Sequence, residues 1–192
     1  MLVELVIHAI AGTANPDEQT MVMLKEKNGE RILPIITSTR RATMLMMRKH
    51  LDVGVPIPLP LSPADIGIQM MQQFGIKLTR VELTALKDGM FFSRVVAERE
   101  GVEQIVDFCQ GPDGLVMAAV ARCPIFVDEE LMDAQYMRPT GANSFALNIN
   151  TISRQMLEDA LKNAVENENY EVASRLRDEL AKRTPEQDPP TA

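Results

Sequence analysis

The C-terminal part of the chain switches to a helical repeat of apolar residues, which restricts this segment to a pair of helices. From residue 153 onward, a first apolar stripe has members spaced at i, i+3, i+4, i+7 and i+8, as on one face of a helix. Its members are Leu157, Ala160, Leu161, Ala164 and Val165. Residues 166–169 interrupt it with turn-favouring side chains. A second stripe follows at Tyr170, Ala173, Leu176 and Leu180.

We therefore predict a helical hairpin over residues 151–184 and a disordered polar tail over residues 185–192. Two short helices have more apolar surface than they can hide between them. Chains below roughly 40 residues usually need a partner to be stable. The hairpin is therefore expected to dock onto its own domain, onto a second copy or onto another protein.

Residues 1–137 carry short strand patterns interrupted by helical ones. The predicted strands are residues 2–10, 19–27, 31–36, 76–86, 90–98, 102–108 and 124–127. The predicted helices are residues 39–51, 62–74, 112–121 and 128–136. Because strands and helices do not alternate strictly, we predict an α+β domain with mixed or antiparallel sheets and three or four short helices. Residues 138–150 are polar, contain Pro139 and Gly141, and are predicted to link this domain to the hairpin.

The second predicted helix has a clear start signal. Ser62 is placed to cap it, with Pro63 at the first helical position and Asp65 at the third. Residues 53–61, just before it, hold three prolines and are expected to be extended. The side predicted to be buried carries three large apolar residues at four-residue spacing, Ile66, Met70 and Phe74.

Length and charge narrow the possible functions. A chain of 192 residues has room for one domain and a small appendage. The net charge of −7, without a long basic run, argues against strong non-specific binding to duplex DNA but leaves a small or single-stranded substrate open.

No stretch approaches the roughly 20 apolar residues that span a membrane. The N-terminal apolar run is interrupted by Glu4 and His8, and is expected to be a strand rather than a signal peptide. Cys109 and Cys123 form no disulfide framework, and are expected to be buried thiols in a reducing cytoplasm.

A more specific pattern overlies the hairpin. Its positions are Ala164, Tyr170, Glu171, Ala173, Leu176, Arg177, Asp178 and Leu180. This pattern resembles the UVR motif of the repair proteins UvrB and UvrC and of some Clp-protease regulators. The resemblance implies pairing with another UVR-type hairpin or helical protein. The implied contact residues are Tyr170, Ala173, Leu176, Arg177, Asp178 and Leu180. The alternative is a generic hairpin packed on its own domain, with Arg177 and Asp178 as a plain surface pair worth under about 1 kcal/mol.

Motifs across residues 1–137 are similar to those of the bifunctional nuclease family, named for DNase and RNase activity. The matching segments are Leu33-Pro34-Ile35, Pro60-Leu61-Ser62, Asp88-Gly89-Met90-Phe91, Ile105-Val106-Asp107 and Pro124-Ile125-Phe126-Val127. The chain departs from the family pattern at several places, and three of these departures replace a charged or titratable residue. Arg41 stands where the family has glutamate, Pro63 where it has histidine, and Gln110 near the place of an arginine.

The resemblance implies a catalytic site at Asp107 and Asp113. Two carboxylates can bind Mg²⁺ or Mn²⁺ and activate water, and Gln110 is the candidate substrate-binding residue. The family's arginine is suited to hold a phosphate, so its loss predicts weak activity. The structural alternatives are a helix cap for Asp113 and a turn residue for Asp107.

Two hypotheses follow. The first is a bacterial nuclease that hydrolyses phosphodiesters with a metal. The second is a catalytically degenerate homodimeric module whose hairpin docks repair or protease-regulating partners.

Overall fold

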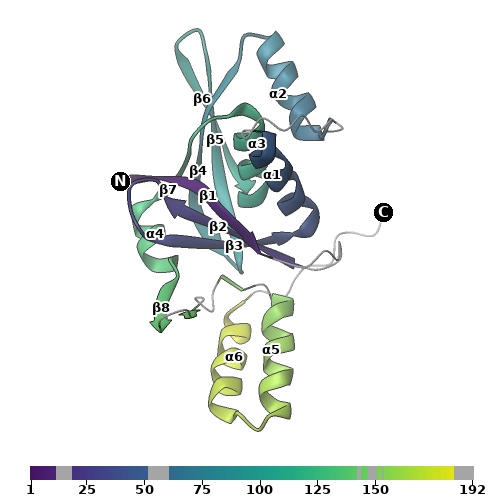
Figure 1. Ribbon diagram of the computed structural model, residues 1–192, viewed down its shortest axis with the longest axis vertical. Helices are drawn as coiled ribbons and strands as arrows, with labels where there is room; N and C mark the ends of the chain where they lie inside the picture. Colours follow the sequence, from purple (N-terminus) through teal and green to yellow (C-terminus); the bar gives the residue numbers. More distant parts are fainter. Residues whose placement is uncertain (12–18, 52–60, 142–143, 147–150, 153, 184–192) are drawn as a thin grey trace.

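The computed structural model describes residues 1–11, 19–51, 61–141, 144–146, 151–152 and 154–183. Most of the predicted extended segment at residues 53–61, and the predicted tail at residues 185–192, lie outside the described residues. The body is built on a seven-stranded sheet with the strand order β3-β2-β1-β7-β4-β5-β6 (Figure 1). The strands are β1 (Leu2–Ala11), β2 (Gln19–Glu26), β3 (Ile32–Ser38), β4 (Lys77–Lys87), β5 (Met90–Arg99), β6 (Val102–Gln110) and β7 (Ile125–Asp128).

Neighbouring strands run antiparallel except for β4 and β7, which are parallel. The sheet is therefore mixed, and the predicted α+β class is confirmed. Pro34 lies in β3, an edge strand of the sheet, as expected for a residue that has no N–H to donate.

Helices α1 (Thr39–Leu51), α2 (Pro63–Gln73) and α3 (Gly111–Ala121) gather beside the sheet, and α4 (Glu129–Gln135) follows β7 (Figure 1). Helix α3 contacts both other helices of this layer and packs on strands β4, β5 and β6. It approaches the strands closely at Gly114, where an added Cβ would lie 2.4 Å from Ser93 Oγ and 3.0 Å from Val81 Cγ1. The core between the sheet and the helices is aliphatic, with Leu24, Leu33, Leu45, Leu83 and Leu115 fully buried.

The face of α2 that enters the core differs from the prediction. The cap is as expected, because Ser62 and Asp65 form a reciprocal capping box. Asp65 and Ile68 are the buried residues of the helix, and Asp65 also pairs with Arg48 of α1. The predicted inner stripe lies outside, with Ile66, Met70 and Phe74 exposed by 48%, 54% and 65%.

That prediction was wrong because apolar spacing does not show which face of a helix turns inward. The buried capping carboxylate and its arginine partner set the rotation of α2.

Residues 138–150 also differ from a plain linker. They contain β8 (Arg138–Gly141) and β9 (Ser144–Ala146), which pair as a small antiparallel sheet. Strands of three or four residues are too short to show an alternating pattern in the sequence.

The C-terminal helices form the predicted hairpin. Helices α5 (Arg154–Glu166) and α6 (Tyr170–Lys182) pack side by side and project from one end of the body (Figure 1). They enclose a core of their own, made of Leu157, Ala164, Ala173 and Leu176. The base of the hairpin sits on the β4–β5 turn. There Gly89 has a φ of +78°, and an added Cβ would lie 2.5 Å from the Ile152 carbonyl oxygen.

None of the helices in the described ranges is long and apolar enough to cross a membrane.

Candidate functional site

Asp107 lies within β6, at an irregularity in the pairing of β5 with β6, and not in a turn. The side chain of Ser93 faces α3, so that of Arg94, the next residue of β5, points to the opposite face of the sheet. Arg94 Nε donates to Asp107 Oδ1 over 2.7 Å, and Arg94 Nη1 lies 3.7 Å from Glu82 Oε2. The Asp107 carboxylate therefore belongs to the face of the sheet that α3 does not cover.

Two arginines organise the charges on this face. Arg80 Nε donates to the buried Glu82 over 2.6 Å, and Arg80 Nη2 donates to Glu103 over 3.2 Å. The Arg80 hydrogen bond lowers the pKa of Glu103 below its usual value, and hydrogen bonding to Asp107 raises the pKa of Arg94. The guanidinium groups stay charged, and each acidic group here already has a cationic partner.

Asp113 is the third residue of α3, whose N-cap is Gln110, so the simple cap alternative does not hold. Its carboxylate is gripped by Arg41 of α1. Arg41 Nε donates to Oδ1 over 2.5 Å, and Nη2 donates to Oδ2 over 3.0 Å. Nη2 also donates to Gln110 Oε1 over 3.1 Å. Arg41 thus brings Gln110 and Asp113 together in a two-pronged grip suited to planar anions.

The two predicted catalytic carboxylates sit in separate ion pairs. Asp107 pairs with Arg94 on the face of the sheet that α3 does not cover. Asp113 pairs with Arg41 in the helical layer. A single ion shared by both carboxylates would have to displace both arginines. The described part of the chain contains no group of three or more His, Cys, Asp or Glu side chains that could hold a metal. This donor set does not fit the shared Mg²⁺ or Mn²⁺ site that the resemblance implies.

Cys109 lies between the two acids in the sequence. Burial raises the pKa of its thiol, and the negative charges of Asp107 and Asp113 raise it further. Cys123 follows α3 in the sequence, and burial raises the pKa of its thiol to about 11. Both thiols are free and only partly buried, so neither is as enclosed as predicted.

Arg41 is the site residue that sequence reasoning missed. Relative to the family pattern, Arg41 stands in the place of an acid, and Gln110 stands near the place of an arginine. The structure brings these two residues into contact, with Arg41 Nη2 lying 3.1 Å from Gln110 Oε1. A guanidinium group is therefore still present at this site, supplied by α1 instead of by the end of β6. The paired change was visible in the sequence, but nothing there showed that the two positions touch.

The predicted partner-binding residues divide into two sets. Ala173 and Leu176 lie in the hairpin's own core, and Leu180 packs against it. Tyr170 is 68% exposed, and the exposed Arg177 and Asp178 pair with each other over 2.9 Å. Val165, near the end of α5, and Val172, near the start of α6, are also exposed. These three residues, Val165, Tyr170 and Val172, flank the turn that lies farthest from the body, and we name them the tip patch (Figure 1).

Comparison with known proteins identifies both parts of the chain. Residues 22–140, more than half of its length, match the model of the bifunctional nuclease domain. The chain belongs to the bifunctional nuclease domain family. In this nuclease-family protein, residues 153–182 match the UvrB/uvrC motif, so both resemblances seen in the sequence are confirmed in the expected order.

The nuclease-family protein also has curated relatives. An uncharacterized protein of Mycobacterium tuberculosis, MT1877 in strain CDC 1551 / Oshkosh and Rv1829 in strain ATCC 25618 / H37Rv, is 26% identical over 117 residues. The match covers 61% of this chain and 66% of the relative. This chain therefore spans slightly less than two thirds of the relatives' length.

Proposed function

We propose that this nuclease-family protein acts mainly as a docking module of the bacterial cytoplasm, with a homodimeric body and a hairpin that recruits other UVR-type hairpins. The supporting observation is that the hairpin projects from the body, encloses its own core and still exposes the tip patch. The two free thiols fit a reducing compartment.

Tyr170 is the proposed anchor of the docking surface. Exposed aromatic residues are over-represented among the residues that dominate binding energy. Arg177 and Asp178 form an exposed pair that contributes little to stability. Across an interface the same two charges fix orientation more than affinity. The expected partners are repair or protease-regulating proteins that carry a UVR hairpin.

Titration calorimetry of the full chain against purified UvrB, UvrC and a UVR-bearing Clp-protease regulator tests this proposal. Tyr170→Ala is expected to weaken binding at least about tenfold, the loss typical of a truncated anchor residue. Phe74→Ala is the matched control, because Phe74 is 65% exposed on α2, away from the hairpin. Equal affinity of the Tyr170 variant and the wild type, or no binding to any of the three proteins, would contradict the proposal.

The contact of Arg41 with Asp113 favours a second candidate function, phosphodiester hydrolysis. In this proposal Arg41 binds a phosphate and offsets charge in the transition state. Asp113 would accept a proton from the attacking water. A phosphate must compete with Asp113 for Arg41, so slow turnover is expected. Asp107 lies on the other face of the sheet and is not needed at this centre. Bound Mg²⁺ or Mn²⁺ would supply positive charge to the phosphate, but the two carboxylates do not form a site for it.

Cleavage of single-stranded DNA and RNA, with Mg²⁺ or Mn²⁺ and with a chelator, tests this second candidate. Arg41→Gln and Asp113→Asn are each expected to lower the rate at least about 100-fold, as loss of a catalytic charge does. Asp107→Asn is the matched control and should retain most activity. No cleavage by wild type, or equal rates for all variants, would remove the catalytic hypothesis.

A further inference from the structure

Strand β6 is an unprotected edge of the sheet. Its nine residues contain no lysine and no proline, the residues that usually guard an edge. Its exposed large apolar side chains are Val102, Ile105, Val106 and Phe108. At the opposite edge, β3 contains Pro34, and the Ile32 carbonyl already accepts a hydrogen bond from the Met137 N–H. Among the described strands only β5 pairs with β6, so every second residue of β6 has outward N–H and C=O groups without a strand partner.

We propose that β6 pairs in antiparallel fashion with β6 of a second copy of this chain, which joins two seven-stranded sheets into one. The inference names the surface of the proposed homodimer and therefore rests on that part of the proposed function. It does not depend on hairpin docking or on catalysis.

The sequence of β6 selects one two-fold register. Centring the pair on Gln104 places Val102 opposite Val106 of the second copy, and Glu103 opposite its Ile105. Centring it on Ile105 would set Glu103 against Asp107, a like-charge pair that is unfavourable. Centring it on Val106 would run the pairing through Phe108, whose φ of +61° interrupts a regular strand. The Gln104 register is the one that avoids both penalties.

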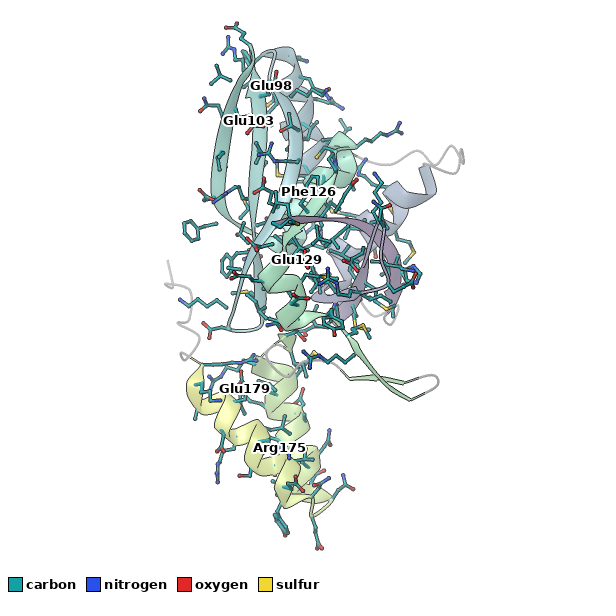
Figure 2. All side chains as sticks on the ribbon, turned by 90° about the vertical axis from the view of Figure 1, so that its left-hand side faces the viewer. Glu98, Glu103, Phe126, Glu129, Arg175 and Glu179 are labelled. Carbon is teal, nitrogen blue, oxygen red and sulfur yellow. The ribbon has the colours of Figure 1, made fainter. Side chains whose placement is uncertain are left out.

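The acidic side chains of β6 do not oppose this pairing. Glu103 is paired with Arg80, and Asp107 with Arg94, within the same chain. Figure 2 shows Glu103 beside Glu98 at one end of the molecule, where β5 and β6 meet. Each acid of β6 therefore already has an arginine partner in its own chain, and the apolar residues supply most of the contact.

Phe108 supplies a large part of the contact area. It is 86% exposed at the end of the strand. In the Gln104 register it lies beside the Glu100–Gly101 turn of the second copy, where the glycine leaves room for a ring. A phenylalanine can bury about 150 Å², roughly a fifth of the 800 Å² or so per partner that a stable interface needs.

Disulfide trapping tests the register. Gln104→Cys, in the full chain with Cys109→Ala and Cys123→Ala, places two thiols directly opposite each other, within the Cβ separation that a disulfide allows. Mild oxidation is expected to convert most of this variant into a covalent dimer. Glu98→Cys in the same background is the matched control, because β5 is one strand further from the two-fold axis. No trapping of the Gln104 variant, or equal trapping of the control, would overturn the proposal.

Light scattering tests the surface independently. The wild type is expected at twice the chain mass of 21.4 kDa. Ile105→Lys should raise the dissociation constant of the dimer at least about tenfold, because each dimer carries the change twice. Ile66→Lys is the matched control, since Ile66 is equally exposed on α2.

A dimer that survives Ile105→Lys unchanged would reject the β6 surface and leave the homodimer standing. A monomeric wild type would reject both the surface and the homodimer, without touching the hairpin proposal.

Discussion

Truncating one leucine of the hairpin should destabilise the hairpin and leave the body intact. Leu157 is fully buried in the cluster formed by α5 and α6, and none of the buried residues of that cluster belongs to the core of the body. Leu157→Ala removes packing that no neighbouring residue can replace in so small a core. This should lower the stability of the hairpin by about 3 kcal/mol. Since every 1.4 kcal/mol is a factor of ten, the opening equilibrium of the hairpin should rise by about 100-fold.

Hydrogen exchange read by mass spectrometry measures this directly. Amides in residues 154–182 should lose protection by about 100-fold, while amides of β4 and β5 stay unchanged. Val165→Ala is the matched control, because Val165 is half-exposed on the same helix and its truncation should shift protection by less than about threefold. Equal loss of protection in the sheet would show instead that body and hairpin unfold as one unit.

Two further predictions concern the base of the hairpin and the cap of α2. Gly89→Ala should lower stability by about 1–2 kcal/mol in thermal unfolding, because the new methyl group meets the Ile152 carbonyl and φ is positive. Gly67→Ala, with nothing within 4 Å, should not. Burial raises the pKa of Asp65, but hydrogen bonds from the capping serine and the charge of Arg48 outweigh it and leave this pKa below 3.8. This carboxylate therefore stabilises the fold above pH 3.8, and its contribution disappears as the pH falls through the lowered pKa. Asp65→Asn should remove that part of the acid transition in a pH titration followed by circular dichroism, and an unchanged transition would contradict the assignment.

Local signals in the sequence predicted the elements of the fold well. Ser62 with Asp65 marked the start of α2, and the break at residues 166–169 marked the turn of the hairpin. Each of these features depends on neighbours within a few residues. That is why a single sequence contains the information.

Features that depend on distant contacts were not predictable in this way. Asp107 and Asp113 are close in sequence, yet they lie on different faces of the sheet. Asp107 pairs with Arg94 on the face that α3 does not cover, and Asp113 lies in α3, where it pairs with Arg41. The grip of Arg41 on Asp113 joins residues 72 positions apart. The outward stripe of α2 follows from a buried ion pair with α1, which apolar periodicity does not report.

Docking of a second helical hairpin onto the tip patch can be followed in solution. Hydrogen exchange of the full chain with and without a saturating UVR-bearing partner tests it most directly. We expect new protection in residues 165–172, at the free end of the hairpin (Figure 1). Protection confined to the sheet, or none anywhere in a complex shown to form, would contradict it.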